Sequence, residues 1–117
     1  ARMPYAHQIV SNVHKAGMLS LVKTLALELA EDGVRINSVC PGRSLTPLWT
    51  NRADRMAAEE GVDRDTIIAR FSQEIPLKRF AEAVEQARVV VFMASQMSSY
   101  MTGQSVNVDG GIARSLT

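Results

Sequence analysis

A helical pattern leads into a short strand pattern at two places in this sequence, and this order constrains the fold more than any single residue does. Residues 13–31 carry apolar side chains at the i, i+3, i+4 and i+7 spacing of one helix face. Gly33 stands where a glycine that caps a helix is expected. Residues 34–40 (VRINSVC) are rich in β-branched side chains and favour a strand, with Val34, Ile36 and Val39 buried, which Pro41-Gly42 ends. The order predicts an α/β fold.

The second occurrence closes the chain. Residues 81–95 have helical spacing, residues 97–103 read as a loop, and residues 104–109 alternate in the manner of a half-buried strand that ends at Gly110-Gly111. Two parallel strands do not make a stable sheet by themselves, and parallel sheets are covered on both faces. We therefore expect further strands, and we interpret this sequence, which has no Met at position 1, as a piece of a longer chain.

Residues 43–80 between the two occurrences are less regular. The pattern predicts a loop over residues 43–47, a helix over residues 48–60 that Gly61 ends, and a second helix over residues 63–74 with Asp63 as its N-cap. Pro76 then breaks the pattern. Two interpretations stay open here, a mobile cover over a cleft and a surface helical hairpin.

Composition narrows the class of protein. A length of 117 residues fits one domain, and 13 Lys and Arg against 12 Asp and Glu leave a net charge of +1, which argues against nucleic-acid binding. The single Cys40 permits no intrachain disulfide and no cysteine cluster for zinc. The longest apolar run, VVVFMA, is far shorter than the ~20 residues of a membrane span, and no signal peptide pattern opens the sequence. We expect a cytoplasmic protein without a membrane segment.

Four segments together carry a family resemblance: residues 15–30 (KAGMLSLVKTLALELA), 33–42 (GVRINSVCPG), 76–95 (which open with PLKRF) and 100–111 (YMTGQSVNVDGG). In their order and spacing they resemble the C-terminal half of the short-chain dehydrogenase/reductase family, in particular its 3-oxoacyl-carrier-protein reductases. The resemblance covers nearly the whole sequence. It implies the C-terminal portion of a Rossmann-type doubly wound parallel sheet with helices on both faces, with residues 1–117 in one domain and residues 45–75 as a helical substrate lid.

The resemblance also implies an activity. The family transfers hydride between NAD or NADP and the carbonyl or alcohol carbon of a small-molecule substrate, and its members associate as dimers or tetramers. The sequence contains no G-x-x-x-G-x-G turn for the cofactor pyrophosphate. The resemblance places that turn, and the family's catalytic Asn and Ser, upstream of Ala1.

Lys15 matches the family's catalytic lysine, which binds the nicotinamide ribose; the alternative is a solvated surface lysine. The catalytic tyrosine position, four residues earlier on the same helix face, is occupied by Ser11. A serine hydroxyl is several pK units less acidic than a phenol, whose pKa is ~10, and it is shorter by a ring. Tyr5, His14 or His7 could replace the phenol. Otherwise the chain is a non-catalytic pseudoenzyme or an assembly subunit.

The sequence Pro41-Gly42-Arg-Ser-Leu-Thr46 resembles the family's P-G-x-x-x-T turn. The resemblance assigns the backbone at Pro41 and Gly42 to the nicotinamide carboxamide and Thr46 to the carboxamide or the phosphates; the alternative is a strand-ending turn with Thr46 as a helix N-cap.

The roles of seven further side chains were also considered. Four apolar side chains of the lid segment could line a substrate pocket or pack within the lid: Leu48, Trp49, Met56 and Phe71. Asn37 and Asp109 are interpreted as polar side chains that fix turns and strand ends. Cys40 is interpreted as a small buried apolar residue rather than a nucleophile.

Overall fold

The computed structural model describes residue 4 and residues 6–115. Helices and strands follow one another as α1 (Ile9–Glu28), β1 (Ser38–Pro41), α2 (Pro47–Glu60), α3 (Arg64–Gln73), α4 (Ala83–Ala94), the short 3₁₀ helix η1 (Gln96–Ser98) and β2 (Ser105–Val108). Each helix and strand expected from the sequence is present with shifted ends. The first residues of the loop expected over residues 97–103 belong to η1. The Ser95 side chain accepts a hydrogen bond from the Met97 N–H and so starts this tight turn.

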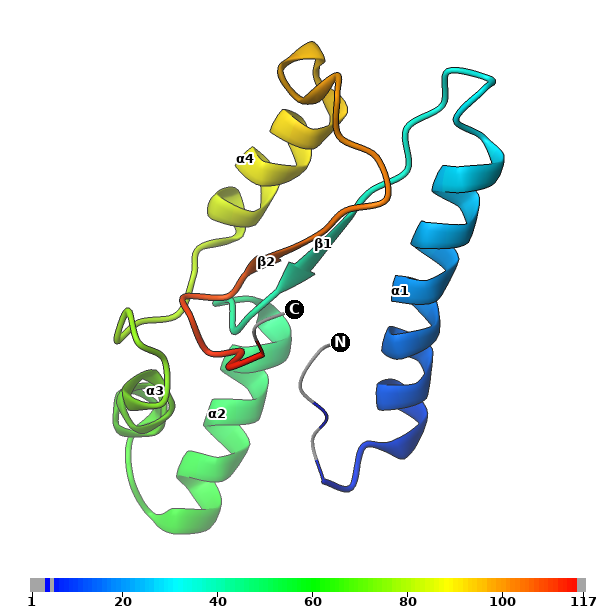
Figure 1. Cartoon of the computed structure of the whole chain (residues 1–117). Coiled ribbons are helices and arrows are strands. Elements are labelled where there is room, and N and C mark those ends of the chain that lie inside the picture. The colour runs from blue at the N-terminus through cyan, green and yellow to red at the C-terminus, as the bar shows by residue number, and fades with distance from the viewer. Residues whose placement is uncertain (1–3, 5, 116–117) are drawn as a thin grey trace.

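The two strands form a parallel pair. Ser38 lies opposite Ser105 and Pro41 opposite Val108, and the Ser38 and Ser105 hydroxyls are hydrogen-bonded at 2.8 Å. In Figure 1 the strands run between α1 on one side and α4 on the other. The chain crosses from one strand to the next through helices, as parallel strands require.

Residues 34–37 were expected to belong to β1, and the structure corrects this. The Ile36 N–H donates to the Thr102 hydroxyl, and the Ile36 carbonyl accepts from the Gly103 N–H. These loop contacts replace the ladder of a strand, so β1 begins only at Ser38. Val34 is exposed and Ile36 and Val39 are half-buried, whereas all three were expected to be buried.

Helix α1 begins four residues earlier and ends three residues earlier than its periodicity predicted. Its first turn carries Ile9 and Val10, which are exposed and so add nothing to the apolar stripe that revealed the helix. At its other end Leu29 is the C-cap, and Gly33, at φ +73°, lies in the turn beyond it. Gly33 therefore ends the turn and is not the cap of the helix.

The α2–α3 hairpin has a core of its own. Helix α2 starts at Pro47, a residue suited to the first turn, and ends at Gly61 in the left-handed region. The Asp63 carboxylate accepts the Thr66 N–H at 2.6 Å, which confirms it as the N-cap of α3. Ala53, Ala57 and Ile67 are buried against one another, with further apolar side chains packed around them. The structure thus confirms a helical hairpin.

Arg35 ties the approach to β1 to the end of α4. Its guanidinium donates to the backbone carbonyls of Met93 and Ser98 at 3.1 and 2.8 Å and to that of Ser95 at 3.2 Å. These carbonyls lie at the end of α4 and in the turns that follow it. One arginine therefore holds two parts of the chain about 60 residues apart in sequence.

Several large apolar side chains of α1 and α4 face solvent. Leu27 is 81% exposed and Val91 is 67% exposed. The radius of gyration is 16.7 Å, above the ~13 Å of a compact domain of this length. The described residues leave these apolar faces uncovered, which agrees with the expectation of further strands. Among the described residues, no helix is both long enough and apolar enough to cross a membrane.

Candidate functional site

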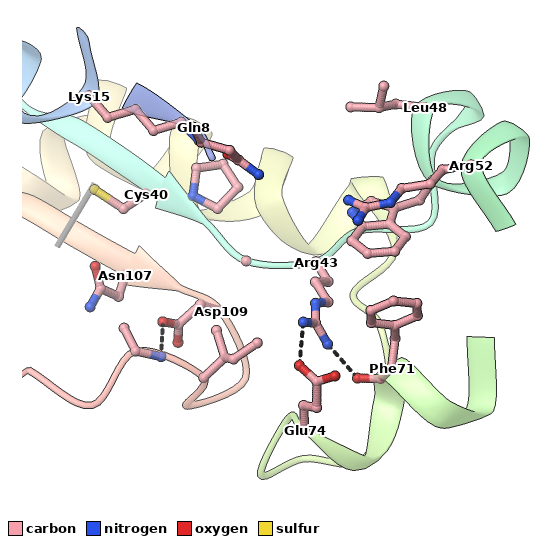
Figure 2. A pocket seen from close by; sticks show the side chains of 15 residues that line it. Gln8, Lys15, Cys40, Arg43, Leu48, Arg52, Phe71, Glu74, Asn107 and Asp109 are labelled. Atoms are coloured by element: carbon pink, nitrogen blue, oxygen red, sulfur yellow. Dashed lines mark hydrogen bonds and ion pairs between the residues drawn. The ribbon is translucent and has the colours of Figure 1, made fainter. Parts of the chain in front are cut away.

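A cavity lies beyond the carboxyl end of β1, where the chain turns toward α2 (Figure 2). Its volume is about 510 Å³. Helix α1, the turn after β1, helices α2 and α3 and the segment around β2 all contribute side chains to its wall. Open α/β sheets bind ligands at this end of their strands, so the position itself marks a candidate site.

The turn at Pro41 and Gly42 forms the floor of the cavity and is tightly fixed. The Gly42 N–H donates to the Val108 carbonyl at 3.0 Å. A Cβ on residue 42 would lie 2.5 Å from the Cα of Asp109, so only glycine fits between the two chain segments. Backbone hydrogen bonds of 2.9 Å from Ala81 to Arg43 and from Leu45 to Ala81 then attach the turn to the start of α4.

Lys15 reaches this cavity from α1, beside Gln8 (Figure 2). Within the described residues its ammonium group has no ion pair or hydrogen bond, and the residue is exposed. The structure therefore brings Lys15, Pro41 and Gly42 together, as the family resemblance predicted for residues around a nicotinamide. Gln8 was not predicted, because a lone glutamine before a helix carries no signal in sequence.

Ser11 lies on α1 one turn before Lys15 and is half-buried, and it is not among the side chains that line the cavity. His7 and His14 are exposed and do not line it either. Tyr5 lies outside the described residues. The cavity wall formed by the described residues therefore contains neither a phenol nor an imidazole.

Thr46 is the N-cap residue of α2. Its backbone is extended and its carbonyl accepts the N–H groups of Trp49 and Thr50 at 2.9 and 3.0 Å, while its hydroxyl makes no capping hydrogen bond. The side chain does not line the cavity. This geometry agrees with the interpretation of Thr46 as the N-cap of a helix.

The apolar side chains of the hairpin divide between the two interpretations that the sequence left open. Leu48 and Trp49 line the cavity, Met56 packs against the hairpin core, and Phe71 does both. Trp49 makes edge-on contacts with Phe71 and Phe80, at centroid separations of 5.2 and 5.0 Å. Such pairs are favourable, so the aromatic wall of the cavity is rigid.

Two arginines that sequence reasoning did not single out accompany this aromatic wall. The Arg43 guanidinium donates to the Phe71 carbonyl and to the Glu74 carboxylate, and it lies 4.9 Å from the Phe71 ring centroid. Arg52 lies 4.8 Å from the Trp49 ring. Arg43 follows Gly42 directly and Arg52 follows Trp49 by one helical turn, so their spacing was a signal that could have been used.

Asn37 and Asp109 have the structural roles that were predicted. The Asn37 side chain donates to the Met101 carbonyl and accepts from the Gln104 N–H. The Asp109 carboxylate accepts the Gly111 and Ala113 N–H groups at 2.9 and 3.0 Å and fixes the turn after β2. Cys40 is half-buried and lines the cavity, which corrects its interpretation as a buried residue, because the cavity leaves one side of this residue open.

Comparison with known proteins shows which protein family this architecture is similar to. The family model described as enoyl-(acyl carrier protein) reductase matches residues 1–113. Oxidoreductase UcpA of Escherichia coli O157:H7 is 37% identical over 97 residues, which are 83% of this chain and 36% of UcpA. The crystal structure of L-sorbose reductase from Gluconobacter frateurii, complexed with NADPH and L-sorbose, superposes with a TM-score of 0.92 at 34% identity, over 97% of this chain and 43% of that one.

A third similar structure is that of another short chain oxidoreductase. The apo structure of a short chain oxidoreductase from Pseudomonas aeruginosa PAO1, described as containing an atypical catalytic center, has a TM-score of 0.84 and 32% identity, over 96% of this chain and 43% of that one. The fold is thus the Rossmann-type α/β fold of nucleotide-dependent oxidoreductases, which confirms the predicted fold class. The chain belongs to the short-chain dehydrogenase/reductase family. It spans about a third of the length of the curated relatives it matches.

Proposed function

We propose that this chain forms the nicotinamide and substrate end of an NAD- or NADP-dependent oxidoreductase that interconverts a carbonyl compound and an alcohol. The observation that carries the proposal is the cavity beyond β1, where Lys15, the Pro41-Gly42 turn and the hairpin side chains meet. Similarity to L-sorbose reductase, whose structure holds NADPH, supports it.

The residues fit one end of such a cofactor. The Lys15 ammonium has donors free of any described partner for ribose hydroxyls. The backbone between Pro41 and Thr46 offers peptide groups for a carboxamide, and a volume of about 510 Å³ accommodates a nicotinamide riboside together with a small substrate. The sequence has no glycine-rich turn, so these residues would not hold the pyrophosphate. A bound nicotinamide supplies the hydride.

The remaining chemistry belongs to the chain itself. In our proposal residues 45–75 act as the lid, and the aromatic wall of Trp49 and Phe71 excludes water from the reacting carbon. Ser11 Oγ holds the position of the proton donor, beside Lys15 on the same helix face. The proposal also takes residues 1–117 as part of one domain of a cytoplasmic homo-oligomer.

A second candidate function rests on Ser11. No phenol lines the cavity among the described residues, and a serine hydroxyl is a much weaker acid than tyrosine. A non-catalytic member of the family, which binds a nucleotide or assembles with a partner without turnover, would have this arrangement. The similar short chain oxidoreductase of Pseudomonas aeruginosa PAO1, described as containing an atypical catalytic center, supports this alternative.

Calorimetric titration of NADH and NADPH into the protein expressed from its whole natural gene tests the proposal. We expect binding that Lys15→Met weakens roughly tenfold or more, because charged hydrogen bonds are lost. Lys23→Met, two turns along the same helix and outside the cavity, is the matched control and should bind normally. Absence of binding would contradict the proposal.

Turnover separates the two candidate functions. Reduction of simple ketones by the unchanged protein supports the oxidoreductase with an unusual proton donor. Activity that appears only in Ser11→Tyr supports the non-catalytic member, because the substitution then restores the missing phenol.

A further inference from the structure

The end of the cavity formed by the hairpin carries positive charge that the chain does not neutralise. Five charged side chains line the cavity: Lys15, Arg43 and Arg52 are cationic, and Glu74 and Asp109 are anionic. Both Asp109 oxygens accept backbone N–H groups, and Glu74 binds Arg43. The lining therefore has a net charge of +1, and Lys15 on α1 and Arg52 on α2 are the cations of the lining without an ion pair among the described residues.

Arg43 is the fixed member of the arginine pair. Its side chain is only 11% exposed, and two of its donors are occupied by the Phe71 carbonyl at 2.6 Å and by Glu74. These bonds attach the turn after β1 to the end of α3. These bonds therefore fix the Arg43 guanidinium next to the aromatic rings.

Arg52 is the free member. It has no ion pair or hydrogen bond to any residue that the structure describes, yet its guanidinium lies 4.8 Å from the Trp49 ring and 5.8 Å from the Phe71 ring. Arg43 lies 5.5 and 4.9 Å from the same two rings. Figure 2 shows Arg52, an exposed residue, reaching from α2 toward the turn that carries Arg43. Because Glu74 already pairs with Arg43, Arg52 is the arginine at these two rings whose charge has no anionic partner among the described residues.

We infer that the substrate carries a carboxylate, and that Arg52 is the residue that selects it. Guanidinium groups present paired N–H donors that match the two oxygens of a carboxylate. Leu48, which is 78% exposed and also lines the cavity, offers an apolar contact for the carbon chain between that carboxylate and the reacting carbon. The inference rests on the proposed function for the reaction, but the binding of the acid can be measured without turnover.

Trp49 provides the readout, because it is the single tryptophan of the sequence and touches the arginine pair. The probes are two oxo acids and their neutral counterparts, 4-oxopentanoate and 4-formylbenzoate with their methyl esters. Fluorescence changes that Trp49→Phe removes are assigned to this site. We expect each acid to bind roughly tenfold or more tightly than its ester.

Arg52→Gln should weaken the acids by about the same factor and leave the esters unchanged. Arg55→Gln, a change of the same charge on the same helix but outside the cavity, is the matched control and should leave both unchanged. Equal binding of acid and ester, or equal effects of the two arginine substitutions, would overturn the inference. Inorganic phosphate that displaces the acids at equal concentration would also overturn it, because the site would then be a general anion site.

NADPH titration runs alongside as a separate measurement. If NADPH fails to bind while the acids still respond to Arg52→Gln, the proposed function fails and the carboxylate site stands. If NADPH binds and the acids show no preference, the carboxylate site fails and the proposed function stands.

Discussion

Two parts of the molecule differ in how they bury apolar side chains: the α2–α3 hairpin, and the part formed by α1, α4 and the two strands. The hairpin closes on itself: Ile67 and Ala53 are fully buried between its two helices, and ion pairs join Asp54 to Arg64 and Glu60 to Arg70. The strand-bearing part leaves large apolar side chains of α1 and α4 in solvent. The cavity lies where the two parts meet.

This difference shows how local each part of the fold is. The hairpin's helices, end signals and core residues lie within about 30 residues of one another, so the hairpin needs little from the rest of the protein. A parallel strand pair depends on neighbours far away in sequence and on cover over both faces. The local closure of the hairpin supports our proposal that it acts as a lid over the cavity.

Removing the hairpin core should have the largest effect. Ile67→Ala deletes a fully buried side chain and should lower the free energy of unfolding by about 3 kcal/mol, because a cavity is left behind. Val91→Ala, in the exposed face of α4, should change it by less than about 0.5 kcal/mol in this chain. Denaturant titration measures both. Equal losses would show that the α4 face is as well covered as the hairpin core and would break the comparison.

The turn that joins the two parts should be next in sensitivity. Gly42→Ala forces a methyl group against the Asp109 backbone and should cost about 1–3 kcal/mol. Gly17→Ala is the matched control, since a methyl group there meets nothing within 4 Å, and it should stabilise α1 by up to about 1 kcal/mol. Thermal unfolding of the two variants shows whether each substitution lowers or raises the stability. A neutral Gly42→Ala would mean that the strand ends can separate freely.

A smaller effect is expected at the start of α3. Asp63→Ala removes the acceptor for the Thr66 N–H and should loosen the first turn of that helix. Amide exchange of residues 64–67 should accelerate, while amides of α1 and α4 keep their rates. Equal acceleration in all helices would show that the hairpin does not unfold as a separate unit.

The smallest effect concerns pH. Two hydrogen bonds of 2.7 Å from Arg79 lower the pKa of Glu85 from its ordinary 4.5 to about 2. Because the pKa is lower in the folded state, the stabilisation is complete above pH 4.5 and disappears as the pH falls toward 2. The gap in melting temperature between the unchanged protein and Glu85→Gln should therefore be small near neutral pH, since the pair is exposed, and vanish near pH 2. A gap that grows in acid would contradict this assignment.

The sequence predicted the hairpin well because its signals are local. Asp63 and Gly61 mark helix ends through their own side chain and backbone preferences, and both predictions are confirmed. The limits of β1 were predicted less well, because they depend on whether Thr102 and Gly103, more than 60 residues away, bond as a loop or as a strand.

The candidate site was predictable only in part for the same reason. Lys15, Pro41 and Gly42 were found through the family resemblance, and the structure brings them to one cavity. The spacing from Trp49 to Arg52 places both residues on one helix face, but local patterns do not encode that this face lines the cavity, because that depends on long-range packing. The role of Ser11 stays a prediction, since its side chain lies outside the cavity wall.

Hydrogen–deuterium exchange with and without NADPH tests the central claim most directly, because it reports the two regions separately in one experiment on the protein expressed from its whole natural gene. The account predicts slower exchange in residues 9–15 and 38–46, which surround the cavity at Lys15 and the strand-ending turn, and unchanged exchange in residues 58–66 at the far end of the hairpin. Protection confined to other segments, or none at all, would contradict the claim that this cavity holds the nicotinamide end.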